Sequence, residues 1–164
     1  HNMLLGAFAV AQKHIRIQSP YFLPETALLG AINTAARRGI TVDIVIPGKN
    51  NLRLVSYAMT AQLDQVIRNQ CRVWQARGNF NHSKLVTIDG AWSYVGSSNM
   101  DPRSLRLNFE LDIEIYSHET AQAIEELIDA EIRNSERITA EKLAATPLRK
   151  RLRNRLIWLA SPYL

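Results

Sequence analysis

The sequence predicts an α/β sandwich, in which helices cover a β-sheet. Two observations carry this prediction. Long segments show apolar residues at helical spacing, and they alternate with short β-branched runs that end at proline or glycine. Strands that alternate with helices along a chain form helix-covered sheets. At 164 residues, the chain has the size of one domain, so we expect a single catalytic domain over residues 1–164.

The first half of the chain is predicted to form alternating helices and strands. The first strand ends at Pro20, which lacks the backbone donor of a central strand, and the second helix ends at Gly39. TVDIVIP is apolar almost throughout, which is typical of a strand buried on both faces. We expect helices at about 2–13, 24–38 and 51–69, and strands at 15–19, 41–47 and 71–76.

The second half changes from helical to alternating periodicity at about residue 84. A hairpin over about 84–97 is followed by a strand at 111–116 and by a charged amphipathic helix from 118 to about 137. The tail at 147–164 is basic and then apolar. It could lie in a lipid interface with Trp158 at the boundary, or form a terminal helix docked on the core with a solvated basic face.

Composition restricts the function classes. The net charge of +5 and the pI near 9.7 favour polyanionic partners, either nucleic acid or an anionic membrane surface. Cys71 is the only cysteine and is expected in the core, which excludes a disulfide framework and a cysteine-based zinc site. No apolar run is long enough to span a bilayer and no signal peptide is apparent, so we expect no membrane span. Carboxylates and histidines do not cluster in the sequence, so we expect no metal or cofactor.

The chemistry is expected in residues 82–99, HSKLVTIDGAWSYVGSSN. Asp89-Gly90 between two β-forming runs predicts a two-residue hairpin turn with positive φ at both positions. If Ile88 faces Ala91, then Lys84 faces Val95 and His82 faces Ser97. His82, Lys84, Ser97 and Asn99 would then project from one face at the end away from the turn, with Val86, Ile88 and Val95 as core on that face.

These residue types suit phosphodiester transfer. An imidazole supplies a nucleophile or proton donor, while lysine and asparagine hold the nonbridging oxygens, so no metal is required. Asp89 would lie in the turn and cap its backbone, a structural role. Glu110 is the candidate carboxylate for orienting His82.

The pattern His82-x-Lys84, four residues, Asp89, six residues, Gly96-Ser97-x-Asn99 resembles the HKD motif of the phospholipase D superfamily. By average residue usage, it would arise by chance at a given position with a probability on the order of 10⁻⁸. IRIQSPYFLP, ARRGITVDIVIP, NMDPRSLRLNFE and the closing LASPYL extend the resemblance to the second half of bacterial cardiolipin synthases.

The resemblance implies a mixed sheet and an active site formed where two HKD motifs meet. One histidine attacks phosphorus to give a phosphohistidine and the other protonates the leaving alcohol. His82, in a C-terminal half, would be the general acid and base. Lys84 and Asn99 would hold phosphate oxygens, Ser97 would support the site, Glu110 would orient the histidine, and Gly96 would be structural.

The implied activity joins two phosphatidylglycerols into cardiolipin at the bacterial cytoplasmic membrane, with a second HKD half as partner. Two alternatives remain open: a homodimeric nuclease with one motif per chain, and an inactive half that lacks its partner. Arg103 and Arg106 could meet a lipid phosphate, and Tyr21 and Phe22 could line the entrance, although surface pairing and core packing are the commoner fates of such residues.

Overall fold

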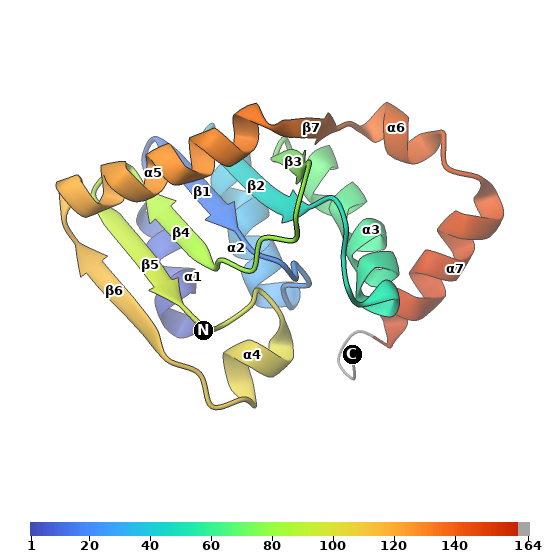
Figure 1. The fold of residues 1–164 in the computed structure, drawn as a ribbon, viewed down its shortest axis with the longest axis horizontal. Coiled ribbons are helices and arrows are strands. Elements are labelled where there is room, and N and C mark those ends of the chain that lie inside the picture. The colour runs from blue at the N-terminus through green and yellow to red at the C-terminus, as the bar shows by residue number, and fades with distance from the viewer. Residues whose placement is uncertain (161–164) are drawn as a thin grey trace.

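The computed structural model describes residues 1–160 and contains a seven-stranded mixed sheet with helices on both faces (Figure 1). The strand order is β6-β5-β4-β1-β2-β3-β7, with β1, β2 and β3 parallel and every other pair antiparallel. The strands are β1 (His14–Gln18), β2 (Thr41–Pro47), β3 (Arg72–Ala76), β4 (Leu85–Ile88), β5 (Trp92–Gly96), β6 (Asp112–Tyr116) and β7 (Ser135–Ile138).

The helices form the two outer layers and confirm the α-β-α sandwich. One face of the sheet packs against α1 (Asn2–Val10), α2 (Thr26–Arg37) and α3 (Arg53–Arg68), and the other packs against α5 (His118–Arg133). The short helices α4 (Pro102–Arg106) and α6 (Ala140–Ala144) connect strands and helices, and α7 (Leu148–Leu159) lies against α3 (Figure 1).

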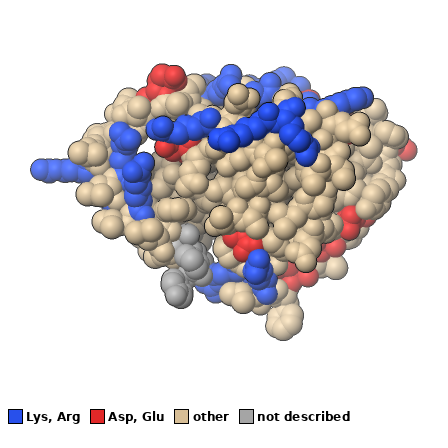
Figure 2. Space-filling view, turned by 180° about the vertical axis from the view of Figure 1, so that it is seen from behind, with Lys and Arg blue, Asp and Glu red and all other residues tan. Residues whose placement is uncertain are grey.

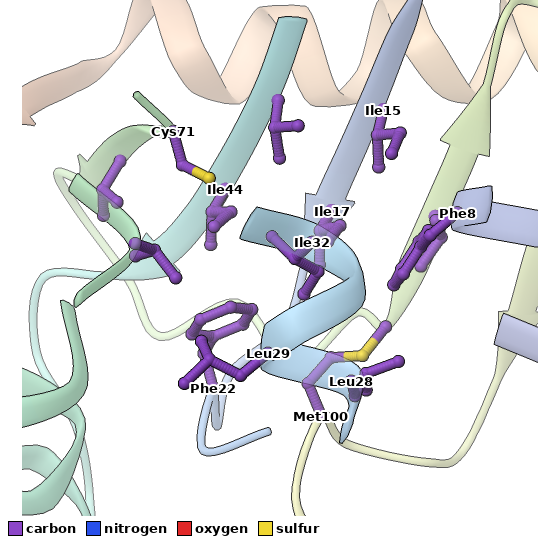
Figure 3. Close-up of a cluster of buried hydrophobic side chains, with 14 of the residues drawn as sticks. Phe8, Ile15, Ile17, Phe22, Leu28, Leu29, Ile32, Ile44, Cys71 and Met100 are labelled. Atoms are coloured by element: carbon purple, nitrogen blue, oxygen red, sulfur yellow. The ribbon is translucent and has the colours of Figure 1, made fainter. Parts of the chain in front are cut away.

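The main core lies between the sheet and helices α1 to α3. Phe8, Ile15, Ile17, Ile32 and Ile44 are completely or almost completely buried there (Figure 3). Burial of one such side chain stabilises a fold by about 1.5–3 kcal/mol. A smaller cluster on the α5 side contains Val45, Ala76, Ile124 and Ile128. The strand β2 therefore contributes to both clusters, as its apolar sequence predicts.

The last predicted helix ends earlier than expected. The helix α5 stops at Arg133, whereas the prediction continued it to about residue 137, and Ser135–Ile138 instead form β7 and pair with β3. The Ser135 hydroxyl donates to the Glu131 carbonyl at the helix end. Because β7 supplies an edge partner for β3, pairing in the sheet outweighs the helical pattern of this segment.

The predicted hairpin register is wrong by one residue. Asp89 and Gly90 have the expected positive φ values of 56° and 63°, and the Ala91 N–H donates to the Ile88 carbonyl at 3.1 Å. However, Ile88 pairs with Trp92 because Ala91 is an extra residue between the turn and β5. A shift of one residue moves every side chain of a strand to the other face of the sheet. Val86 and Ile88 therefore share the main core with Tyr94, whereas Val95 packs with Leu85 on the α5 side.

Candidate active site

His82 and Lys84 meet at the open end of the β4–β5 hairpin. The Lys84 ammonium Nζ lies 2.7 Å from His82 Nδ1 and 2.9 Å from the His82 carbonyl oxygen. The lysine is 9% exposed, whereas the histidine ring faces solvent. Because an ammonium group only donates, Nδ1 accepts the hydrogen bond and the proton of the neutral ring lies on Nε2.

The pKa values of this pair depend on burial and on neighbouring charge. Burial lowers the pKa of His82, and the positive charge of Lys84 lowers it further. Burial also lowers the pKa of Lys84, while the negative charge of Glu110 acts in the opposite direction. Both effects on His82 favour its neutral imidazole, and an anion bound between His82 and Lys84 would raise the pKa of His82 instead.

Two aromatic rings hold the imidazole in place. The Tyr21 ring meets His82 edge-on with centroids 6.0 Å apart, and the Phe80 ring lies 5.6 Å away. The Tyr21 hydroxyl donates to the Asn51 side chain at 2.7 Å. Tyr21 therefore lies at the site, whereas Phe22 is buried in the core. Phe80 was not predicted from the sequence, although its position two residues before His82 was the available signal.

Asn99 lies where the segment after β1 runs beside the segment after β5. The Leu23 N–H donates to the Met100 carbonyl at 2.7 Å, which fixes the two segments together. Asn99 Nδ2 donates to Ser104 Oγ at 3.2 Å, whereas Asn99 Oδ1 is buried and has no partner among residues 1–160. A buried acceptor without a donor is costly unless a ligand or water supplies one.

A cavity of about 170 Å³ opens beside Asn99. Tyr21 joins this cavity to His82, because its ring lines the cavity and also contacts the imidazole. Leu23, Leu52 and Val55 give the cavity an apolar wall, and Asn99, Asp101, Arg103, Ser104 and Asn108 give it a polar wall. Such a lining can accommodate a ligand with an apolar part and a polar, anionic part.

Ser97 does not face His82 as predicted, because the register shift turns it to the other side. Its hydroxyl is exposed and accepts from the Leu111 N–H at 3.0 Å, so it helps attach the start of β6 to β5. Ser98 is buried instead, where its hydroxyl donates to the Asp112 carboxylate and its N–H donates to the same group at 3.0 Å. Ser98 and Asp112 were not selected, and the extra residue Ala91 was the signal that would have identified Ser98.

Gly96 is required by the close approach of β6. A Cβ atom at this position would lie 2.0 Å from Asp112 Oδ1 and 2.6 Å from the Leu111 carbonyl oxygen. The backbone of β5 can therefore pass β6 only without a side chain here.

Asp89 lies at the opposite end of the hairpin, in the turn. Its carboxylate accepts from the N–H groups of Gln12, Lys13 and His14 at 2.8–2.9 Å, so it fixes the α1–β1 connection and does not cap its own turn. Burial alone would raise the pKa of Asp89, but these hydrogen bonds and the charge of His14 together lower it.

Glu110 does not contact His82 as predicted. Its carboxylate accepts from the Asn108 side chain at 3.3 Å, and no hydrogen bond joins it to His82 within residues 1–160. Arg106 pairs with Glu25 at 2.6 Å, whereas Arg103 lines the cavity beside Asn99.

In the part of the chain that the structure describes, no three His, Cys, Asp or Glu side chains gather in a way that could hold a metal ion. No helix there is both long enough and apolar enough to cross a membrane.

The arrangement defines a class of protein with a phospholipase D-like fold. The chain superposes on Nuc from Salmonella typhimurium, a phospholipase D family member, with a TM-score of 0.73 at 19% identity over 84% of this chain and 90% of that one. It also superposes on phosphatidylserine synthase from Haemophilus influenzae with a TM-score of 0.75 at 21% identity over 98% of this chain and 44% of that one. At these identities, the similarity concerns the fold.

Sequence comparison identifies the family. Residues 4–132 match the family described as "Cardiolipin synthase, PLD-like domain", and the chain belongs to it. All 164 residues align at 37% identity with cardiolipin synthase A of Klebsiella pneumoniae (strain 342), and at 35% with cardiolipin synthase A of Yersinia pseudotuberculosis. The chain spans about a third of the length of these relatives, 34% in each case.

Proposed function

We propose that this chain supplies one half of a two-histidine phosphatidyltransferase site that makes cardiolipin from two phosphatidylglycerols. The observation that carries the proposal is the meeting of His82 and Lys84 at an open rim, close to a cavity where the buried Asn99 Oδ1 has no partner among residues 1–160. Lysine and asparagine beside an imidazole suit a phosphodiester, whose nonbridging oxygens gain charge during transfer.

In the proposed reaction, His82 is the general acid and base, and a second histidine from the partner half is the nucleophile. The partner's imidazole forms an N–P bond while the P–O bond to glycerol breaks, and His82 Nε2 gives its proton to the departing oxygen. A hydroxyl of a second phosphatidylglycerol then attacks phosphorus and gives its proton to His82 Nε2. The N–P bond breaks and cardiolipin is released.

Lys84 must change partners during this cycle. As a general acid, His82 needs a proton on both ring nitrogens, so Nδ1 cannot keep accepting from the Lys84 ammonium group. A bound phosphodiester would draw Lys84 to its oxygens and raise the pKa of His82. Glu110, whose charge already acts on Lys84, is our candidate acceptor for the Nδ1–H in that loaded state.

The cavity beside Asn99 is the proposed position of a phosphatidylglycerol headgroup. Asn99 Oδ1 accepts only, so a glycerol hydroxyl is a suitable donor for it, whereas Arg103 at the polar wall suits the phosphate. Leu23, Leu52 and Val55 would contact the adjoining hydrocarbon. We assign the reaction to the surface of the bacterial cytoplasmic membrane, where both lipid substrates reside.

A second HKD motif is needed to complete the site. We propose that it comes from the N-terminal part of a longer chain, of which these residues would be the C-terminal half, because the cardiolipin synthase relatives are about three times as long as this chain. A second copy of the chain is the other possible source.

A nuclease is the second candidate function. The chain covers 90% of Nuc from Salmonella typhimurium, so a phospholipase D family member of about this size shares the fold. The net charge of +5 would suit DNA. The identity of 37% with cardiolipin synthase A favours the lipid reaction.

Two proteins test the proposal: the chain alone, and a hybrid in which the chain replaces the aligned segment of Klebsiella pneumoniae cardiolipin synthase A. Each is incubated with phosphatidylglycerol vesicles or plasmid DNA in the presence of EDTA, and products are followed by mass spectrometry and gel electrophoresis. Cardiolipin from either protein supports the proposal. Nicked DNA without cardiolipin supports the nuclease. If both proteins are folded and neither makes cardiolipin, the lipid function is contradicted, and a folded chain that does not nick DNA contradicts the homodimeric nuclease.

A further inference from the structure

The helix α7 docks on the molecule through one face only. Ile157 and Trp158 are half-buried and pack against the main core, and Asn154 is 6% exposed. The Arg153 guanidinium lies over the Tyr57 ring of α3, 3.6 Å from its centroid. Of the two alternatives for the tail, a lipid interface or a helix docked on the core, the structure shows docking, with the Trp158 ring half-buried against the core.

The opposite face of α7 carries a row of leucines that residues 1–160 leave exposed. Their spacings of four, four and three residues place them along one side of a helix. This row, called the leucine stripe below, consists of Leu148, Leu152, Leu156 and Leu159, which are 75%, 58%, 61% and 69% exposed. Single exposed leucines are common on protein surfaces, but an aligned set of four is an unusual apolar surface for a helix in water.

Cations surround the leucine stripe on both sides. No acidic residue occurs in α7, and none of its cations forms an ion pair within residues 1–160. Lys and Arg side chains project from the α7 end of the molecule, at the left of Figure 2. The cations of α7 are Arg149, Lys150, Arg151, Arg153 and Arg155.

We propose that the leucine stripe of α7 inserts into an anionic lipid surface while Arg149, Arg151 and Arg155 bind lipid headgroups. The chemistry favours lipid over a protein partner. Long arginine side chains beside buried leucines can extend their guanidinium groups to the headgroup layer, and each cation near an anionic surface adds to binding. A protein groove would have to supply an apolar floor and anions on both of its sides.

This inference rests on the proposed function only for its choice of lipid, phosphatidylglycerol. The helix would hold the domain against the membrane that contains the proposed substrates. Because binding is measured without turnover, failure of the helix to insert and failure of the chemistry are separate results.

A fluorophore on the leucine stripe tests the inference directly. Leu156→Cys is labelled with an environment-sensitive dye, and Leu127→Cys on α5 is the matched control, since Leu127 is 63% exposed and Leu156 is 61% exposed. The native Cys71 should remain unlabelled because it is buried and its pKa is raised to about 12, mainly by burial. With phosphatidylglycerol vesicles, we expect a blue shift and quenching by spin-labelled lipid at position 156 and little change at position 127.

Vesicle sedimentation provides the second readout. Leu152→Asp with Leu156→Asp should lower partitioning onto phosphatidylglycerol vesicles by tenfold or more, since two leucines no longer leave water. Added salt or phosphatidylcholine vesicles should also weaken binding of the unmodified chain. No blue shift, equal shifts at positions 156 and 127, or unchanged binding of the double variant would overturn the inference. A blue shift that appears on concentrating the chain without lipid would assign the stripe to a second copy and overturn it as well.

Discussion

The two ends of the β4–β5 hairpin contrast in how their polar groups are satisfied. At the turn, the Asp89 carboxylate accepts three backbone hydrogen bonds at 2.8–2.9 Å. At the open end, His82 is exposed, Lys84 lies against it, and Asn99 Oδ1 is buried without a partner among residues 1–160. A polar group whose hydrogen bonds are all made within the chain can stabilise the fold, whereas a polar group that can still form hydrogen bonds is able to bind a ligand.

The contrast divides one sequence motif into two physical roles. Asp89 and Gly96 belong to the framework, because one fixes the α1–β1 connection and the other lets β6 approach β5. His82, Lys84 and Asn99 are the proposed chemical groups. Substitutions at the two ends should therefore affect different measurements.

The largest expected effect is on turnover at the open end. In the active hybrid, His82→Ala should reduce cardiolipin formation by about 10²–10⁴-fold, the usual contribution of acid–base catalysis. Its free energy of unfolding should change by less than about 0.5 kcal/mol, because the ring is exposed. Full turnover in a folded His82→Ala hybrid would rule out a catalytic role.

At the turn end, Asp89→Ala should lower the free energy of unfolding by about 2–4 kcal/mol, because three N–H groups lose a charged acceptor. Asp89→Asn tolerates the positive φ and isolates the loss of charge. Because the pKa of Asp89 is lowered on folding, its contribution is present above the ordinary value of 3.8 and is lost as pH falls through the folded value. In urea titrations across this pH range, the free energy of unfolding should depend less on pH in Asp89→Asn than in the unmodified chain. An unchanged pH dependence would contradict the assigned role.

Gly96→Ala should destabilise the fold by about 1–3 kcal/mol, since the new Cβ would overlap Asp112 and the backbone of Leu111. Gly30→Ala in α2 is the matched control, because nothing lies within 4 Å of its added Cβ. That control should be neutral or stabilising by about 0.5–1 kcal/mol. Similar denaturant midpoints for the two variants would argue against a steric requirement at Gly96.

The smallest expected effect is on the pKa of His82. Lys84→Met removes the positive charge but keeps a long side chain, so the pKa should rise toward the ordinary value of 6.5. Lys13→Met, before β1 and near the turn end, is the control. Proton NMR titration of the His82 ring measures both variants, and a pKa unmoved by Lys84→Met would contradict the proposed coupling.

Periodicity was sufficient to predict the sandwich and the order of its main elements. It could not predict β7, because Ser135 to Ile138 form a strand only where β3 offers an edge. The hairpin register failed for a local reason. Asp89 and Gly90 adopt the predicted turn, but the extra residue Ala91 shifts every later pairing by one.

Contacts between distant segments limited the prediction of the site. The contact of His82 with Lys84 lies within the short segment before β4, and alternation along the chain could predict it. The placement of Tyr21 against His82 depends on how separate loops meet, and so does the lack of a hydrogen bond between Glu110 and His82 within residues 1–160. Ser98, not Ser97, points to the inner face, because a one-residue shift of register turns each side chain to the opposite face of the sheet.

The central claim, that the open end of the hairpin binds a phosphodiester, is tested most directly by NMR titration of the chain with glycerophosphoglycerol, a water-soluble headgroup diester. We predict saturable shifts of the His82 ring and the Asn99 side-chain amide, together with a rise in the pKa of His82, while the Asp89 and Gly90 amides stay unchanged. Shifts confined to the arginines of α7, or equal shifts at both ends of the hairpin, would contradict the claim.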